Sequence, residues 1–183
     1  MFPVFLDTCV LLKSYLCDTV LTIAETGICR PLWSRDVLVE LERNLRKRGA
    51  TDAQMAHRLA QMSTHFLDAE VVGYEPLIDV MTNDPKDRHV LAAAVRGGAE
   101  ILVTENLKDF PASALAPYDI AVVDQDTFLL DQLDLAPVLV IAALRRQVSR
   151  YRREPRAVDD LLNMLAGQGH GCPRFARACR ERL

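Results

Sequence analysis

The sequence predicts an α/β fold, a three-layer arrangement in which helices cover both faces of a central, mostly parallel sheet. Short apolar runs of strand length alternate along the chain with segments of helical periodicity. Runs this short and this apolar are typical of strands buried on both faces, and their alternation with helices is typical of a parallel sheet. The 183 residues, 50% of them hydrophobic, suffice for one domain with a sizeable core and a small appendage.

Five short apolar segments are the candidate strands. They comprise residues 2–6, 67–74, 101–104 and 120–124, with 29–34 as a weaker candidate. The first run stops directly at an acidic residue, and the later runs are rich in Val and Ile. Their lengths are those of strands rather than of helices.

Helical patterns lie between these runs. Residues 36–48 place Val37, Leu41 and Leu45 on one face, with Ser34 or Asp36 as the candidate cap. Further helices are expected at residues 51–62, 86–96, 124–133, 138–153 and 156–165, before a short basic segment at 173–183. Because the pattern changes after Pro137, we expect a first domain at residues 1–135. A helical, Arg-rich C-terminal extension at residues 136–183 is expected to pack on it.

Charge is unevenly distributed between these two parts. Residues 1–135 carry an excess of nine acidic residues and residues 136–183 an excess of six Arg, which leaves a net charge of −3. An acidic body with a basic tail indicates partner binding rather than a particular fold. No apolar run reaches the roughly 18 residues of a membrane helix, and the N-terminus has no basic leader. With five scattered cysteines and no CxxC pair, we expect reduced thiols in a cytoplasmic protein.

Acidic and polar residues recur where the predicted strands end or the following helices begin. They are Asp7, Glu40, Asp84, Asp87, Asn106 and Asp109. In an open parallel sheet, ligands bind at the carboxyl ends of the strands, so we expect these side chains to converge there. A hard divalent cation such as Mg²⁺ would offset their repulsion and could activate water at a phosphodiester. No Gly-rich phosphate-binding loop is present, which disfavours binding of ATP or a dinucleotide.

Four segments carry a more specific signal. They are the strand-to-acid opening at residues 4–8, the second acidic segment at 34–41, the third at 83–94 and the closing motif at 102–111. In this order they resemble the PIN-domain ribonuclease family, which includes the VapC-type toxins.

The resemblance implies a Rossmann-like PIN domain with the activity of a Mg²⁺- or Mn²⁺-dependent endoribonuclease. Such an enzyme hydrolyses single-stranded or loop RNA by metal-assisted attack of water on phosphorus. The resemblance also implies that the chain is the toxin of a toxin–antitoxin pair. Its expected partners are a cognate DNA-binding antitoxin and a second copy of itself.

The resemblance assigns roles by position. The catalytic and metal-binding acids are Asp7, Glu40, Asp87 and Asp109. Further candidate metal ligands are Asn106 and Asp84, and the supporting hydroxyl residues are Thr8 and Thr104.

Several of these residues also have a purely structural interpretation. Asp7 and Asp87 could be ordinary helix caps. Glu42 is a rival to Glu40 on the same predicted helix. By helical spacing from Asp87, we expect His89 to point away from the site.

The Arg residues of the extension are also open to two interpretations. Arg145, Arg146, Arg152 and Arg153 form either a solvated face or a contact surface for RNA phosphates. Two alternatives to the ribonuclease also remain. Another metal-dependent nuclease or phosphoesterase would use much the same acids, and a catalytically weak PIN-like module would bind RNA or a protein partner.

Overall fold

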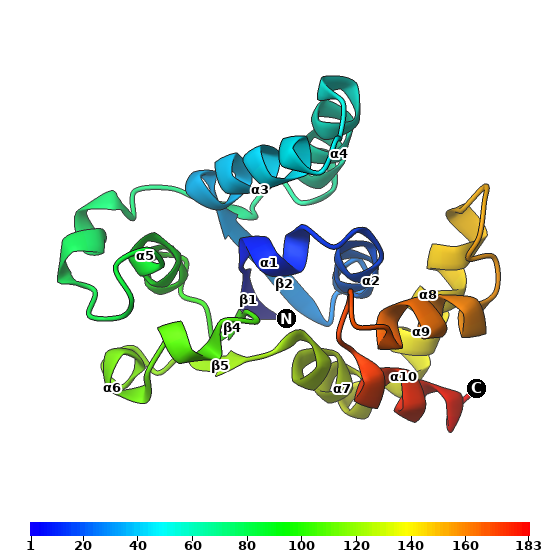
Figure 1. The fold of residues 1–183 in the computed structure, drawn as a ribbon. Coiled ribbons are helices and arrows are strands. Elements are labelled where there is room, and N and C mark those ends of the chain that lie inside the picture. Colours follow the sequence, from blue (N-terminus) through cyan, green and yellow to red (C-terminus); the bar gives the residue numbers. More distant parts are fainter.

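The computed structural model describes residues 1–183 and shows one five-stranded sheet layered between helices (Figure 1). The strands are β1 Phe2–Leu6, β2 Cys29–Ser34, β3 Glu70–Val71, β4 Ile101–Val103 and β5 Ala121–Val123. Their order is β3-β2-β1-β4-β5, and all four neighbouring pairs are parallel. The predicted α/β class with a parallel sheet is confirmed.

Strand β3 is shorter than the sequence predicts. The apolar run 67–74 contributes only Glu70 and Val71, which pair with the end of β2 at the edge of the sheet. Gly73 follows with a φ of +72°, a conformation that leaves the extended region and ends the strand. Apolar composition alone therefore overestimated the length of this edge strand.

Ten α-helices and two 3₁₀ helices surround the sheet. The helices are α1 Thr8–Leu11, α2 Ser14–Ala24, α3 Arg35–Lys47, α4 Asp52–His65, α5 Arg88–Arg96, α6 Ala112–Leu115, α7 Gln125–Leu135, α8 Pro137–Arg150, α9 Val158–Ala166 and α10 Pro173–Arg180, with the 3₁₀ helices η1 Glu75–Val80 and η2 Leu107–Asp109. Helix α5 lies on one side of the sheet, and α2, α7 and the C-terminal helices lie on the other (Figure 1). The sequence analysis predicted no helix at α1, α2 or α6, and it described the segment of α10 only as short and basic.

The C-terminal helices share the core of the sheet. One hydrophobic cluster includes Phe5 and Leu102 from the strands together with Leu144, Leu161 and Phe175 from α8, α9 and α10. Helix α8 packs on α2, and α10 packs on α7 and α9. The segment after Pro137 is therefore built into the same core rather than folded around a separate one.

A buried carboxylate fastens α10 to the rest of the molecule. Asp126, in the first turn of α7, is 5% exposed and accepts hydrogen bonds from the backbone N–H groups of Arg174 and Phe175 at 3.2 and 2.8 Å. It also pairs with the Arg174 guanidinium at 2.9 Å. These contacts satisfy N–H groups at the start of α10, which have no partners within the helix.

The sheet order places β1 and β4 side by side at its centre. The chain continues from β1 and from β4 to opposite sides of the sheet, so their carboxyl ends flank a topological switch point, where ligands bind in this class of fold. The N–H of Asp7 donates to the carbonyl of Val103 at 3.1 Å, which holds the two strand ends together.

A membrane-spanning helix needs about 18 or more predominantly apolar residues. No single helix has both the necessary length and apolar composition. Helices α7 and α8 meet those requirements only as a pair, which is bent by 118°.

Candidate active site

Asp7 lies at the carboxyl end of β1 and is 4% exposed. Its Oδ1 accepts the backbone N–H of Thr8 at 2.6 Å, so the residue does cap α1. Its Oδ2 accepts the hydroxyl of Thr104 at 2.7 Å and the thiol of Cys9 at 3.3 Å. Burial raises the pKa of Asp7, the Thr104 hydrogen bond opposes that rise, and the charge of Glu40 adds to it. Capping occupies only one oxygen, and both oxygens are held in fixed directions.

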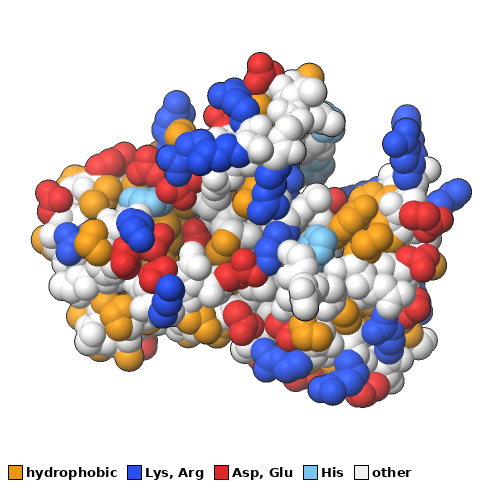
Figure 2. All heavy atoms as spheres, in the orientation of Figure 1, with side chains coloured by type: hydrophobic (Ala, Val, Ile, Leu, Met, Phe, Trp, Pro, Cys, Tyr) orange, Lys and Arg blue, Asp and Glu red, His pale blue; other side chains and the backbone are white.

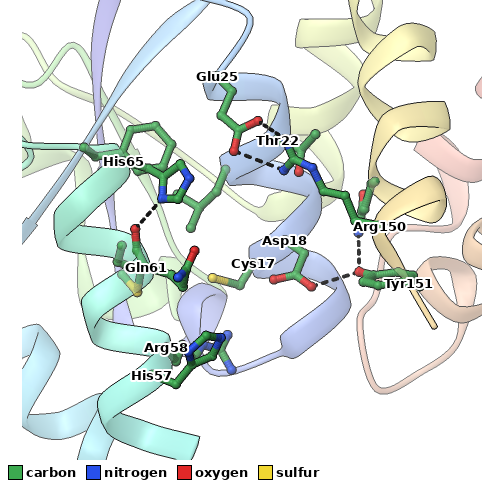
Figure 3. A pocket seen from close by; sticks show the side chains of 14 residues that line it. Cys17, Asp18, Thr22, Glu25, His57, Arg58, Gln61, His65, Arg150 and Tyr151 are labelled. Atoms are coloured by element: carbon green, nitrogen blue, oxygen red, sulfur yellow. Dashed lines mark hydrogen bonds and ion pairs between the residues drawn. The ribbon is translucent and has the colours of Figure 1, made fainter. Parts of the chain in front are cut away.

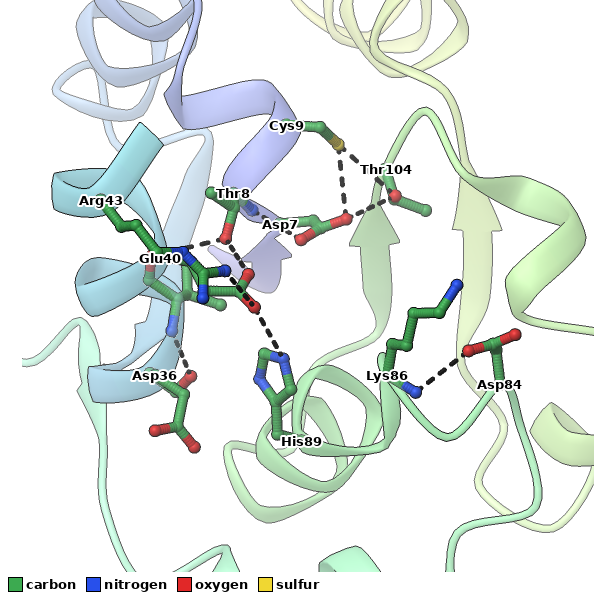
Figure 4. Close-up of polar contacts among 12 residues, drawn as sticks. Asp7, Thr8, Cys9, Asp36, Glu40, Arg43, Asp84, Lys86, His89 and Thr104 are labelled. Atoms are coloured by element: carbon green, nitrogen blue, oxygen red, sulfur yellow. Dashed lines mark hydrogen bonds and ion pairs between the residues drawn. The ribbon is translucent and has the colours of Figure 1, made fainter. Parts of the chain in front are cut away.

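Two threonine hydroxyls orient two carboxylates. Thr104 directly follows β4, is fully buried and donates to Asp7. Thr8 donates to Oε2 of Glu40 at 3.0 Å and to the carbonyl of Val37 at 3.4 Å (Figure 4). Each hydroxyl thus orients one acidic side chain at the switch point.

Glu40 lies on α3 and points toward the carboxyl edge of the sheet, where Asp7, Asp84, Asp87 and Asp109 also lie; this acidic edge is called the cleft. In the first turn of α3, the Val37 N–H donates to the Ser34 hydroxyl. Its Oε1 lies 3.5 Å from Nε2 of His89 and 3.7 Å from the Arg43 guanidinium. The hydrogen bond from His89 is the largest of the effects that lower the pKa of Glu40, so this carboxylate stays ionised. Glu42 makes none of these contacts and lines a surface hollow at the end of α3.

The expectation that His89 points away from the site is wrong. It assumed that Asp87 lies inside the helix, so that the two side chains would project in different directions. Helix α5 instead begins at Arg88, and Asp87 lies in the preceding turn, so helical spacing does not relate the two residues. The first turn of α5 faces Glu40, and the imidazole of His89 points at that carboxylate (Figure 4).

Asp87 occupies the cap position of α5, but its side chain makes no capping hydrogen bond. The pKa of this half-buried carboxyl is raised from 3.8 to about 6 by burial first and then by the charges of Asp7, Asp109 and Asp84. The charges of Asp7, Asp109 and Asp84 thus act on Asp87, as expected for acids that follow strands or begin helices at one edge of a parallel sheet. Figure 2 shows acidic side chains concentrated around α5 and basic ones over α3.

The two loops that carry the remaining candidates are tied together. The N–H of Asp84 donates to the carbonyl of Asp109 at 3.1 Å, and its carboxylate accepts the N–H of Lys86 at 3.0 Å. Asp109 ends η2 and is half-buried. Asn106 is exposed; its N–H donates to the Thr104 hydroxyl at 3.1 Å, and its side chain forms no hydrogen bond. Asp84 and Asp109 therefore lie near enough to Asp87 to affect its pKa, whereas no contact links the Asn106 side chain to the other candidates.

Comparison with known proteins matches these elements to two family models. Residues 3–108, more than half of the chain, match the model described as PIN domain. This chain belongs to the PIN-domain family. Residues 125–181 match the model described as VapC50 C-terminal domain, so the PIN domain is followed by a segment of VapC50 type.

One similar protein comes from Mycobacterium tuberculosis and is named "Putative ribonuclease VapC50". It is 48% identical over 109 residues, which are 60% of this PIN-domain chain and 63% of the relative. The match thus covers less than two thirds of the relative's length. No solved structure matches this chain significantly.

The four candidate Arg residues of the extension form no ion pair with the candidate acids Asp7, Glu40, Asp84, Asp87 and Asp109. Arg146 pairs with Glu25 at 3.3 Å and donates to the carbonyl of Thr22 at 2.9 Å, so it stabilises the packing of α8 on α2. Arg145, Arg152 and Arg153 are exposed and unpaired. None of the four contacts a cleft acid, and their contact with RNA stays a prediction.

The cleft of the PIN domain fits a hard cation in its donor chemistry. Its donors are carboxylate oxygens, and a bound divalent cation relieves the repulsion that raises the pKa of Asp87. No three or more His, Cys, Asp or Glu side chains lie close enough together in this conformation to hold a metal ion between them.

A separate pocket of about 360 Å³ lies between α2, α4 and α8 of the PIN-domain chain (Figure 3). Asp18 in it accepts the hydroxyl of Tyr151 at 2.8 Å, and Glu25 at its edge pairs with Arg150 at 2.9 Å. None of the cleft acids lines it. Sequence analysis did not find this pocket, because its walls come from three helices far apart along the chain.

Proposed function

We propose that this PIN-domain protein is a divalent-metal-dependent endoribonuclease that hydrolyses single-stranded or loop RNA. The observation that carries the proposal is the geometry of Asp7, a buried carboxylate whose two oxygens are oriented by the Thr8 N–H and the Thr104 hydroxyl. Around it the fold gathers the further acids that raise the pKa of Asp87. Carboxyl groups with perturbed pKa values at a topological switch point are typical of a functional site rather than of a structural one.

The proposed ligands of Mg²⁺ or Mn²⁺ are Asp7, Glu40, Asp87 and Asp109, with Asp84 and Asn106 as additional candidates. A bound cation would supply the positive charge that activates water and stabilises the leaving oxygen. The protein's own part is positioning. Thr104 and Thr8 hold Asp7 and Glu40 in place, and His89 keeps Glu40 ionised.

The proposed partners follow from the VapC-type toxin resemblance and from the relative's printed name, "Putative ribonuclease VapC50". We infer that the chain is the toxin of a toxin–antitoxin pair, that a cognate DNA-binding antitoxin blocks the acidic cleft, and that the chain forms a homodimer. The exposed Arg residues at the end of α8 are available for RNA phosphates.

The test is cleavage of a mixed pool of structured RNAs by the purified protein with Mg²⁺, with Mn²⁺ and with EDTA. Asp7→Asn keeps the size and shape of the side chain, removes its charge and replaces one of the two accepting oxygens with an NH₂ group. Asp68→Asn, at an exposed acid outside the cleft, is the matched control. We expect metal-dependent cuts by the wild type and by Asp68→Asn, and none by Asp7→Asn. Full activity of folded Asp7→Asn would overturn the proposal, as would cleavage that persists in EDTA.

A further inference from the structure

Glu105 lies in the loop that carries the candidate site, between Thr104 and Asn106. Its backbone N–H donates to the thiol of Cys9 at 3.3 Å, and that thiol donates to Oδ2 of Asp7 at 3.3 Å. Its carboxylate forms an ion pair with Lys13 and accepts a hydrogen bond from Nε2 of Gln125 at 2.8 Å. The residue after Thr104 is therefore held through both its backbone and its side chain.

Gln125 links this loop to the C-terminal segment. It is the first residue of α7, is buried, and donates from the same Nε2 to the carbonyl of His170 at 3.1 Å. The segment between α9 and α10, which contains His170, runs back toward α2 and α7 at the centre of the molecule (Figure 1). One amide group thus bridges Glu105 and a residue that lies 65 positions later in the chain.

The C-terminal segment is itself held in place. The ring of His170 packs against Tyr15 of α2, with 5.6 Å between the ring centres. Gly171 has a φ of +70°, and a Cβ built on it would lie 3.0 Å from Nε2 of Gln125. A side chain at this position would push the amide away from its two acceptors. The conformation and the space at Gly171 both suit the bridge.

We propose that the segment around His170 and Gly171 is a positioning element of the active site. Through Gln125 and Glu105 it holds the loop after β4 so that the Thr104 hydroxyl stays 2.7 Å from Asp7. Such a hydrogen bond fixes the carboxylate only while its donor is held in turn, and displacement by about 1 Å can cost on the order of 100-fold in rate. This role rests on the proposed nuclease function. It makes the VapC50-type segment part of the catalytic apparatus.

A purely stabilising role for the network predicts something different, and α7 provides the comparison. Gln132 is also buried on this helix and, like Gln125, leaves its side-chain oxygen without a hydrogen-bond partner. It makes no hydrogen bond to the site loop. Replacing either glutamine with the similarly shaped Met removes a buried amide, but only Gln125→Met breaks the bridge to Glu105.

The experiment compares Gln125→Met, Gln132→Met and Glu105→Ala in the full chain. The measurements are thermal unfolding, together with kcat and KM for an RNA that the wild type cleaves. We expect kcat to fall about tenfold or more in Gln125→Met and in Glu105→Ala, with KM within about twofold of the wild type. Gln132→Met is expected to keep kcat, and because it breaks no hydrogen bond of the bridge, its Tm is expected to change less than that of Gln125→Met. Combining Gln125→Met with Glu105→Ala is expected to add little, because both break one bridge.

The outcomes separate this inference from the proposed function. If the wild type cuts RNA and Glu105→Ala retains its kcat, the positioning role is wrong, whether or not Gln125→Met folds. Equal losses of kcat in Gln125→Met and Gln132→Met would also refute it, since the effect would then come from replacing a buried amide on α7 and not from breaking the bridge. Absence of cleavage by the wild type would instead refute the nuclease function on which the inference rests.

Discussion

Asp87 offers a test of whether the acids converge as described, independent of any substrate. In the metal-free protein its pKa is raised from 3.8 to about 6 by burial and by neighbouring carboxylates. A carboxyl with a raised pKa in the folded state favours the unfolded state wherever it must ionise. The destabilisation is absent below about pH 4, develops between about pH 4 and pH 6, and is complete above that range.

The size of the effect follows from the pKa shift. Two pKa units correspond to about 3 kcal/mol, because each unit is worth about 1.4 kcal/mol. The side chain is partly exposed, and solvent screening reduces that ceiling to about 1–2 kcal/mol. Since Asp87→Asn removes the charge, we expect the variant to be more stable than the wild type by this amount near neutral pH. The corresponding rise in Tm is about 3–6 °C for a chain of this size.

The assay is urea unfolding in EDTA, at about pH 4 and about pH 7.5, for the wild type and Asp87→Asn. Asp68→Asn serves as control, because this exposed acid lies outside the cleft. The expected gain in the free energy of unfolding appears at the higher pH and not at the lower one. A loss of stability at neutral pH, or an equal gain at both pH values, would refute the description of Asp87 as one of several crowded charges.

Three further substitutions test other contacts. Thr104→Val removes the hydroxyl that donates to buried Asp7, so we expect the free energy of unfolding in urea to fall by about 1–3 kcal/mol and the cleavage rate to fall as well. Thr104→Ser keeps a hydroxyl and should largely restore both. Asp126→Ala leaves N–H groups at the start of α10 unpaired, and should cost about 2–3 kcal/mol in urea unfolding; an unchanged unfolding midpoint would contradict this reading. Gly97→Ala would place a Cβ 2.8 Å from Val71, and the overpacking should lower stability by about 1–3 kcal/mol, measured as a drop in Tm.

Much of the fold could be predicted because its signals are local. Strands β1, β4 and β5 are apolar throughout and were recognisable as short runs between helical patterns, whereas β2 contains Arg30 and was the weaker candidate. Helix α2 was not predicted, because seven of its 11 residues are buried and a segment this apolar shows little helical periodicity in its sequence. The length of edge strand β3 was overestimated, because hydrogen-bonded pairing with β2, and not apolar composition, determines where the strand ends.

The candidate acids could be placed for a similar reason. The ends of strands and the starts of the following helices meet at one edge of the sheet, so Asp7, Asp87 and Asp109 could be assigned to one cleft from order alone. Their catalytic and metal-binding roles stay predictions. The direction of His89 could not be obtained, because a helix that begins two residues later than expected changes which side chains face the cleft.

The bridge from the C-terminal segment to the site loop had no sequence signal. It depends on Glu105, Gln125 and His170, which come together only after α7 and α10 have packed. Each residue taken alone is an unremarkable polar side chain. Contacts of this kind are set by tertiary packing and require the structure.

The most direct test of the central claim, that these acids form one cation site, is a titration of Mn²⁺ into the purified protein with bound metal counted by electron paramagnetic resonance. The wild type would be compared with Asp7→Asn, Glu40→Gln, Asp87→Asn and the control Asp68→Asn. We predict that the wild type and Asp68→Asn bind Mn²⁺ alike and that each cleft substitution weakens binding at least about tenfold, the equivalent of about 1.4 kcal/mol. Unchanged binding in the three cleft variants, or none in the wild type, would contradict the claim.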